Sequence, residues 1–268
     1  MATYEQQEEL LKGPQSYSKT DPDASFMPLK DGQLLPAYNI IEGSENQFIV
    51  NYTIHQTASE TNEFVPDIKE LARFTEQSPQ NVIGDAAYGS EENYTYLQEH
   101  GLGNYLKYSG IYFEKRAKHK NNPFHRDNFA YDPDEDQFSC PANKAVEFQY
   151  ETRRRTKSGY QRKVRVYESI SCSSCPLAEA CKRGKKNKQI KFSPVFEGYK
   201  KEVKENLRSE LGMSLSKQRC VAGETPFGEI KHNMGYRGFR LRVLAKVHIE
   251  WGLVSIAHNL GKLSKLAA

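Results

Sequence analysis

The order of segments between residues 37 and 108 is the feature that most restricts the folds open to this chain. Runs of β-branched and aromatic residues, typical of strands, alternate with stretches in which apolar side chains recur at helical spacing. The expected strands are residues 37–42, 47–55, 81–84 and 104–108, and the expected helices are residues 63–75 and 91–100. This alternation predicts an α/β fold, with a hairpin turn at residues 43–46 (GSEN) between the first two strands.

A carboxylate, Asp85, comes directly after the apolar strand expected at residues 81–84. Ligands of α/β sheets gather at the carboxyl ends of strands, so this position favours a binding or catalytic role. Gly89 allows a tight turn, and Ser90 can cap the helix that follows. The alternative interpretation is an aspartate that only forms a turn.

A second carboxylate stands in the stretch RCVAGETPFGEIK, residues 219–231, where Glu224 begins an expected helix. Gly228 and Lys231 follow at spacings of four and three, so the three residues lie near one helical face. The cations close to Glu224 in the sequence are Arg219, Lys231, Arg237, Arg240 and Arg242. A carboxylate among cations suits a site that holds a divalent metal against a phosphodiester. The alternative is a solvated helix end of mixed charge.

The chain contains five cysteines, four of them in a charged region with little helical periodicity. These four are Cys140, Cys172, Cys175 and Cys181. A C-x2-C pair with two further cysteines in a reducing compartment suits a structural zinc site. Their irregular spacing leaves buried thiols as the alternative, and Cys220 is an expected core residue.

Charge is unevenly distributed along the chain. The net charge is +4, but residues 151–191 hold 13 Lys and Arg against 3 Glu, a local net charge of +10. This concentration favours a local contact with a polyanion. No apolar run approaches the roughly 18 residues that cross a bilayer, and the acidic start MATYEQQEELL lacks the apolar core of a signal peptide. We therefore expect a cytoplasmic protein with reduced cysteines and no membrane contact.

The N-terminal region is expected to hold a short helix at residues 1–12 and a loop at residues 14–36. Within that loop, Asp21 and Asp23 form a turn or, alternatively, bind a metal.

Two helices are expected near the C-terminus, residues 195–211, ended by Gly212, and residues 242–262. The apolar stripe on the second is Val243, Val247, Trp251, Val254, Ala257 and Leu260. The expected division of the chain is 1–36 (helix and loop), 37–109 (first part of the α/β domain), 110–194 (basic, Cys-rich insertion) and 195–268 (helical C-terminal part).

Several stretches together resemble one protein family. They are SYSKTDPDASFM, AYNIIEGSENQFIV, DAAYGSEENY, CP followed by CSSCPLAEAC, ETPFGEIKHNMGYRGF and WGLVSIAHNLGKL. This joint pattern covers nearly the whole chain and resembles the C-terminal part of DDE-type insertion-sequence transposases, which have an RNase H-like fold. The resemblance implies an RNase H-like mixed sheet flanked by helices, with the cysteine region as a small insertion.

The resemblance also implies roles for single residues. Asp85 would be the second acid of the catalytic triad and Glu224 the third, both binding Mg²⁺ or Mn²⁺. Lys231 keeps the E-x6-K spacing at which relatives contact DNA, whereas Arg219 lies one residue away from the arginine position of that pattern. The expected DNA contacts are Arg219, Lys231, Arg237, Arg240 and Arg242. The expected partner is DNA, as transposon ends and target, with a homodimer left open, and the expected location is the nucleoid.

One departure from the family concerns the first acid, which in relatives sits on an opening strand before the SYSKTD segment. This chain begins after that strand, and the N-terminal DNA-binding helices of relatives are also absent. Asp31 is no substitute, because no apolar strand precedes it. We therefore expect a truncated polynucleotidyl transferase that is catalytically incomplete. The competing interpretation is a DNA-binding remnant without activity, and metal-dependent DNA cleavage by the chain alone separates the two.

Overall fold

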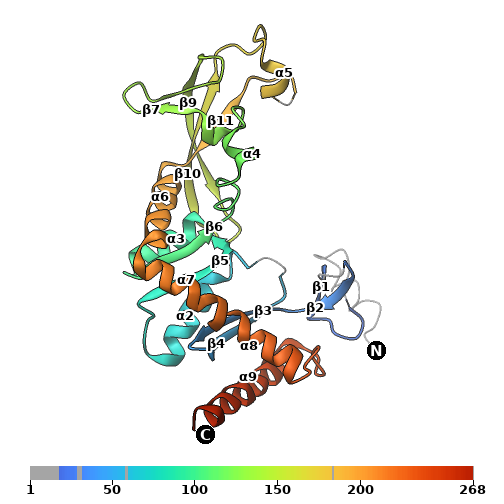
Figure 1. Ribbon diagram of the computed structural model, residues 1–268. Coiled ribbons are helices and arrows are strands. Elements are labelled where there is room, and N and C mark those ends of the chain that lie inside the picture. Colours follow the sequence, from blue (N-terminus) through green and yellow to red (C-terminus); the bar gives the residue numbers. More distant parts are fainter. Residues whose placement is uncertain (1–17, 29–31, 58–59, 183, 268) are drawn as a thin grey trace. The chain divides into compact units, whose positions relative to one another are not determined.

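The computed structural model describes residues 18–28, 32–57, 60–182 and 184–267, with Glu224 described by its backbone alone. The chain divides into two compact units, whose elements are labelled in Figure 1. Unit 1 comprises Met1–Ile83 and Ser209–Ala268, and unit 2 comprises Gly84–Arg208. Unit 1 is therefore built from two segments that the whole of unit 2 separates along the chain.

Unit 1 opens with a small sheet of two strands, β1 (Ser25–Pro28) and β2 (Leu34–Ala37). They pair antiparallel, with Ser25 opposite Ala37. The loop expected over residues 14–36 is therefore wrong for these segments, because the two strands satisfy each other's backbone groups. The helix expected at residues 1–12 lies outside the described residues.

The expected hairpin is confirmed as β3 (Asn39–Glu45) and β4 (Phe48–His55), which pair antiparallel. Its turn falls on Asn46 and Gln47, whose φ angles are 52° and 69°. Two successive positive φ angles are the signature of a type I′ turn, which matches the twist of the strands. The turn therefore begins later than expected, and Gly43 remains in the strand at a bulge.

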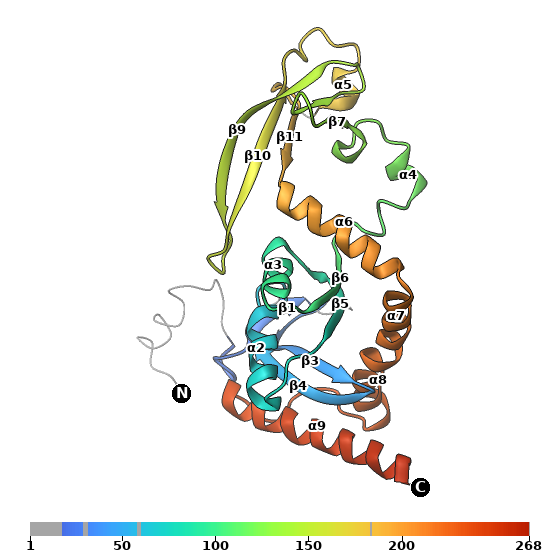
Figure 2. The ribbon, with the colours of Figure 1, turned by 90° about the vertical axis from the view of Figure 1, so that its left-hand side faces the viewer.

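Helix α9 (Leu244–Ala267) lies along β4 in unit 1 (Figure 2). The buried core between them consists of Ile49, Ile54, Ile230, Val247 and Trp251. Asn259 fastens the helix to the strand, because its side-chain amide accepts from the Ile49 N–H at 2.9 Å and donates to the Ile49 carbonyl at 2.9 Å. The Asn259 side chain thus satisfies both the N–H and the carbonyl of Ile49, which a neighbouring strand would otherwise do.

The apolar stripe expected on α9 is confirmed at Val247, Trp251 and the partly buried Val254. It is wrong at Val243, Ala257 and Leu260, which are exposed. The buried face continues instead to His258, whose Nε2 lies 3.0 Å from the backbone oxygen of Gln47. Polar contacts with β4, rather than apolar spacing, orient this half of the helix. Its outward face carries the exposed residues Ile249, Leu253, Ile256, Leu260 and Leu263.

The remaining helices of unit 1 are α2 (Phe64–Thr75), α7 (Glu210–Ala222), α8 (Glu224–Gly228) and the single π-helical turn η2 (Glu229–Asn233). Helix α2 confirms the expectation for residues 63–75. Gly212 does not end a helix as expected. The break comes at Ser209, whose Oγ accepts the Gly212 N–H at 3.0 Å and caps α7 as a new helix.

Unit 2 begins within β5 (Asn81–Gly89), which is followed by α3 (Glu91–Glu99) and β6 (Gly103–Tyr108). The cap expected at Ser90 is confirmed, because its Oγ accepts the Asn93 N–H at 3.2 Å. The strand runs further than expected, so Asp85 lies in its middle rather than at its end. Strand β5 pairs with β6. The two backbones approach so closely at Gly89 that a Cβ there would lie 2.2 Å from the Lys107 carbonyl oxygen.

A five-stranded antiparallel sheet fills the region expected to be a Cys-rich insertion, in the order β11-β10-β9-β8-β7. Its strands are β7 (Ala130–Asp132), β8 (Gln137–Ser139), β9 (Ala145–Arg155), β10 (Gln161–Ser169) and β11 (Gln189–Phe192). The hairpin expected around residues 146–150 and 164–167 is confirmed as β9–β10. The sheet's buried core is Phe129, Phe138, Val146, Tyr167 and Ile190.

Helix α6 (Pro194–Arg208) packs on α3 within unit 2. The Tyr94 and Phe196 rings stack with centroids 6.0 Å apart, and the Tyr199 hydroxyl donates to Gln98 Oε1 at 2.7 Å. These contacts hold β5, α3 and β6 together with the five-stranded sheet. The compact units consequently divide the chain elsewhere than at the boundaries expected at residues 109 and 194.

The mixed α/β class expected from the sequence is confirmed by the elements of both units. One continuous mixed sheet is not formed, because the described strands pair in four separate sheets of two, five, two and two strands. Among the described residues, no helix combines the length and apolarity that crossing a lipid bilayer requires.

Candidate functional site

The two expected acids belong to different units. Glu224 is the first residue of α8 in unit 1, directly after Gly223, whose N–H donates to the Arg219 carbonyl at 2.9 Å. Asp85 lies in unit 2, exposed on β5, and its Oδ1 accepts the Ala86 N–H at 3.2 Å. Each acid is placed within its own unit, and the approach of the two carboxylates stays a prediction.

Cations follow Glu224 on the surface of unit 1. Lys231 in η2 is exposed, and its Nζ lies 5.4 Å from the ring centre of Phe227, one turn earlier. The side chains of Arg237, Arg240 and Arg242 are also exposed, and Arg242 donates to the Thr20 hydroxyl at 3.1 Å. These exposed cations can reach a phosphate backbone.

One carboxylate, Glu250 of α9, fixes the loop that carries these arginines. It accepts hydrogen bonds from the Tyr236 hydroxyl at 2.9 Å and from the N–H groups of Arg240 and Leu241 at 2.9 Å and 2.8 Å. Burial raises the pKa of Glu250, but these hydrogen bonds outweigh it and hold the pKa below its usual range. A charged Glu250 therefore keeps the backbone of this loop in place.

The aspartates of the SYSKTDPD segment take a structural role at the start of α9. Asp21 Oδ1 accepts the Val243 N–H at 3.1 Å and the Tyr38 hydroxyl at 2.9 Å, and Asp23 Oδ2 accepts the Leu244 N–H at 2.9 Å. Both carboxylates thus satisfy free amides of a helix N-terminus, where negative charge is favoured. These contacts support the structural interpretation of this segment over metal ligation.

A buried carboxylate, Glu42 on β3, was missed by sequence reasoning. In the described part of the chain, neither of its oxygens has a hydrogen-bond partner. Burial raises its pKa to about 8, and Lys231 opposes the shift. The alternating strand pattern offered the one available signal, because Glu42 stands two positions from Ile40 on the side of β3 that faces the core.

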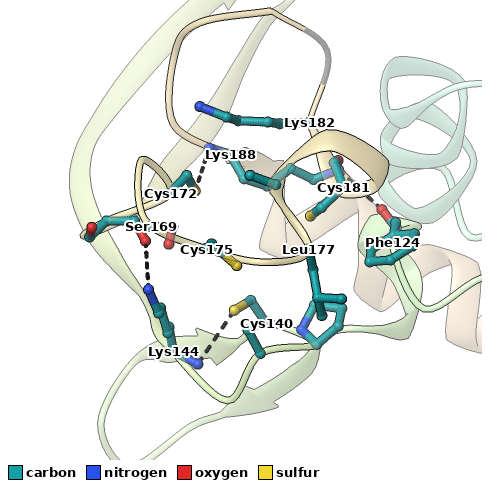
Figure 3. Close-up of a pocket in the computed structure, with 14 residues that line it drawn as sticks. Phe124, Cys140, Lys144, Ser169, Cys172, Cys175, Leu177, Cys181, Lys182 and Lys188 are labelled. Atoms are coloured by element: carbon teal, nitrogen blue, oxygen red, sulfur yellow. Dashed lines mark hydrogen bonds between the residues drawn. The ribbon is translucent and has the colours of Figure 1, made fainter.

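The four cysteines of the proposed zinc site line one small pocket beside the five-stranded sheet. Cys140 follows β8, Cys172 and Cys175 follow β10, and Cys181 ends the short helix α5 (Ala178–Cys181). Figure 3 shows the Cys140 and Cys175 sulfurs directed toward the same space. All four cysteines are free of disulfide bonds.

Backbone amides point at two of these sulfurs. The Lys144 N–H donates to Cys140 Sγ at 3.4 Å, and the Lys188 N–H donates to Cys172 Sγ at 3.5 Å. Burial raises the pKa of the Cys181 thiol, Lys188 lowers it, and the neighbouring cysteines raise it. Four thiols that line one pocket, two of them accepting a backbone N–H, have the donor chemistry of a structural zinc site.

A basic two-stranded ribbon extends from the five-stranded sheet (Figure 2). Strand β8 pairs with β9 only over residues 145–147, and β11 pairs with β10 only over residues 165–168. The outer residues, 152–155 of β9 and 161–164 of β10, pair only with each other and are called the basic ribbon below. Its exposed cations are Arg153, Arg154, Arg155 and Lys163.

The cations of the basic ribbon are arranged in pairs across the strands, with Arg153 opposite Lys163 and Arg154 opposite Arg162. Among the described residues, Arg153, Arg154 and Lys163 form no ion pair with an acidic side chain. The tip of the ribbon is held on α3, because the Thr156 hydroxyl donates to Glu92 Oε2 at 3.3 Å. Like charges thus lie side by side on an exposed surface, an arrangement that favours the binding of an anionic ligand.

Residues 139–264 match a protein-family model described as a transposase DDE domain. The matched range contains Glu224 and Lys231, the four cysteines and the basic ribbon, whereas Asp85 precedes it. Searches of curated proteins and of solved structures gave no match.

Proposed function

We propose that this chain acts in DNA transposition as a DDE-type polynucleotidyl transferase. The observation that carries the proposal is the match of residues 139–264 to the transposase DDE domain. Two further features support it: exposed cations after Glu224 and the basic ribbon. Both suit a phosphodiester substrate.

The catalytic part of the proposal rests on Asp85 and Glu224. Carboxylate oxygens are the ligands that Mg²⁺ and Mn²⁺ prefer, and Asp85 is exposed on its strand. A bound metal pair would activate the attacking oxygen and stabilise the leaving oxygen. The chain's own residues supply the rest: the two carboxylates hold the ions, and Lys231 neutralises phosphate. An RNase H-like arrangement, in which the two acids meet, belongs to this proposal.

DNA binding is assigned to the basic ribbon together with Arg219, Lys231, Arg237, Arg240 and Arg242. A two-stranded antiparallel ribbon fits the major groove of B-DNA, and exposed arginines reach phosphates on either side. The four-cysteine pocket would hold a structural Zn²⁺ that fixes the loops next to the same sheet. Association with the nucleoid follows from DNA binding, and a homodimer is compatible with it.

A DNA-binding chain without cleavage activity is the second candidate function. The resemblance assigns two of the three acids to Asp85 and Glu224, whereas a metal pair needs a further bridging carboxylate. We therefore propose that the isolated chain binds DNA and does not cut it.

The salt dependence of DNA binding tests the assignment of the ribbon. Fluorescence anisotropy with a labelled duplex compares the wild type with the triple variant Arg153→Ala, Arg154→Ala and Lys163→Ala. The slope of log affinity against log salt falls by roughly 2–3, because each lost phosphate contact removes about 0.9. The control with equal charge loss is Lys201→Ala, Arg208→Ala and Lys217→Ala, all exposed and outside the ribbon. Equal slopes in the two triple variants would reject the ribbon as the DNA contact.

Cleavage is tested with supercoiled plasmid in Mg²⁺ or Mn²⁺. The expected result is binding without nicking. Nicking that disappears in Asp85→Ala and in Glu224→Ala would show that another residue of this chain completes the metal site, and the second candidate would be rejected.

A further inference from the structure

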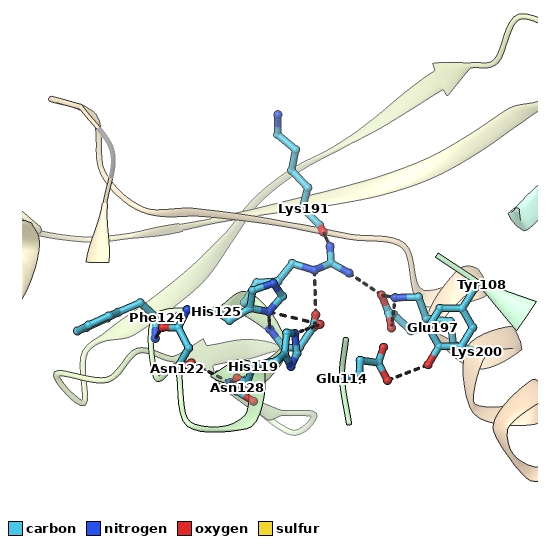
Figure 4. Close-up of polar contacts among 12 residues, drawn as sticks. Tyr108, Glu114, His119, Asn122, Phe124, His125, Asn128, Lys191, Glu197 and Lys200 are labelled. Carbon is cyan, nitrogen blue, oxygen red and sulfur yellow. Dashed lines mark hydrogen bonds and ion pairs between the residues drawn. The ribbon is translucent and has the colours of Figure 1, made fainter. Parts of the chain in front are cut away.

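A group of two histidines and one aspartate lies in unit 2, outside every site described above. His119 belongs to the short helix α4 (Ala117–Lys120), and His125 and Asp127 belong to the 3₁₀ turn η1 (Arg126–Asn128) and the residue before it. One potential ligand atom from each of the three side chains lies within 4.8 Å of the other two. Figure 4 shows the rings of His119 and His125 side by side, with their centroids 4.2 Å apart. In the sequence the three residues have the spacing H-x5-H-x-D, which does not correspond to a familiar metal-binding motif.

The distances within this trio suit a metal better than they suit hydrogen bonds. Asp127 Oδ2 lies 3.4 Å from His119 Nε2 and 3.4 Å from His125 Nδ1. A charge-assisted N–H···O bond is shorter, at about 2.7–2.9 Å. Ligands bound to one Zn²⁺ at about 2.0–2.1 Å in a tetrahedron lie about 3.3–3.4 Å apart. A single oxygen at this distance from two ring nitrogens therefore matches two edges of a metal tetrahedron.

The lone pair of His125 Nδ1 is held on the side of the ring that faces Asp127. The Asp127 N–H points at His125 Nδ1 at 3.4 Å, which requires the lone pair on that nitrogen. A metal would use the same lone pair and would therefore displace this long hydrogen bond. His119 is the most enclosed of the three, with its side chain 16% exposed, whereas that of His125 is 41% exposed. The fourth coordination position thus lies on the side open to water.

Other contacts around the trio hold its backbone in place and do not involve the ligand atoms. Arg126 Nε donates to Asp127 Oδ1 at 3.1 Å, the carboxylate oxygen that faces away from the histidines. The same guanidinium reaches Glu197 Oε1 of α6 at 2.8 Å. Asn128 Nδ2 donates to the His119 carbonyl at 2.8 Å. Such outer contacts orient ligands and are typical of metal sites.

We propose that His119, His125 and Asp127 bind one divalent transition-metal ion, with Zn²⁺ as the reference ion and water at the fourth position. Two imidazole nitrogens and one carboxylate form a donor set suited to Zn²⁺ and its neighbours and less suited to Mg²⁺. The ion fixes the connection between β6 and β7, where the described elements are the short α4 and η1. Its ligand atoms differ from those of the four-cysteine pocket and of the proposed catalytic metals, although His125 and Cys181 line one neighbouring pocket.

Metal titration of the full chain tests this proposal. The background variant is Cys175→Ser, which removes a thiol ligand from the other site, and Co²⁺ serves as an optical probe. We expect one equivalent of Co²⁺ to bind in this background with ligand-field absorption and without a thiolate charge-transfer band. His119→Gln and His125→Gln each lower the affinity at least about tenfold. The matched control, His100→Gln, removes an exposed histidine of unit 2 outside the trio and leaves the titration unchanged.

Equal Co²⁺ affinity in His119→Gln, His125→Gln and His100→Gln would overturn the proposal. Asp127→Asn keeps the shape of the side chain and loses its charge. It weakens binding at least about tenfold, which provides the readout if a histidine variant does not fold.

Discussion

The buried carboxyl of Glu42 makes the stability of unit 1 depend on pH. Its pKa is about 8 in the folded chain against 4.5 as the ordinary value. Because the folded pKa is raised, the folded state keeps a proton that the unfolded chain releases between these two pH values. The contribution of Glu42 is thus most favourable below pH 4.5, falls as pH rises toward 8, and is constant above that.

The size of this effect follows from the pKa difference. Each pH unit inside the window changes the free energy of unfolding by up to about 1.4 kcal/mol, so the change from pH 5 to pH 7.5 is about 3 kcal/mol. Glu42→Gln replaces the protonated acid by a neutral group of the same shape. We expect the variant to gain about 3 kcal/mol relative to wild type across this range, with the smallest difference near pH 5.

Urea unfolding at pH 5, 6, 7 and 8 measures this difference. Trp251, the sole tryptophan of the sequence, lies in the core of unit 1 and reports the unfolding of the unit that contains Glu42. Burial also raises the pKa of Asp67, to about 6, but that carboxyl is common to both proteins and cancels in the comparison. Glu45→Gln, an exposed position on the same strand, should keep the wild-type pH profile. Parallel profiles for Glu42→Gln and wild type would refute the reasoning.

Three further changes have defined outcomes. Gly89→Ala places a methyl group 2.2 Å from the Lys107 carbonyl oxygen and should lower the free energy of unfolding by at least about 2 kcal/mol. Urea unfolding measures this loss, and Gly198→Ala, where a Cβ meets no atom within 4 Å, is the control. Asp23→Ala removes the acceptor for the first amide of α9 and should cost about 1 kcal/mol, read from Trp251 fluorescence; an unchanged midpoint would contradict the capping role. Cys175→Ser should abolish thiolate-bound zinc in metal analysis of purified protein, whereas Cys220→Ser should not, and equal zinc content in both would leave the cysteines as plain buried thiols.

Elements whose signals are local could be predicted from the sequence. The β3–β4 hairpin and α2 follow from β-branched runs and helical spacing, and the start of α3 follows from Ser90, which caps it. Each of these signals acts within a few residues, so no knowledge of distant partners was needed.

Features that depend on distant partners escaped prediction. The strand around Asp85 continues because β6 pairs with it, and the pairing of β1 with β2 is equally invisible to local pattern. Gly212 sits inside α7 because Ser209 accepts its amide, so the serine rather than the glycine decides where the helices divide. The trio His119, His125 and Asp127 comes together through turns that carry no periodic signal.

Of the candidate site, the sequence identified the residue types and left their arrangement open. The four cysteines line one pocket and several cations lie on one ribbon, whereas zinc binding and DNA contact stay predictions. The environment of Glu42 could not be predicted, because a glutamate in a strand is usually solvated, whereas tertiary packing buries this one.

The split composition of unit 1 has a consequence for synthesis on the ribosome. The Asn259 side chain is hydrogen-bonded to Ile49, which lies 210 positions earlier in the sequence. Trp251 packs in the same core as Ile49 and Ile54 of β4. At translation rates of about 5–20 residues per second, the nascent hairpin waits roughly 10–40 s before its covering helix is made. During that interval its apolar face is open to chaperones and to other nascent chains, whereas unit 2 is continuous and can fold as it emerges.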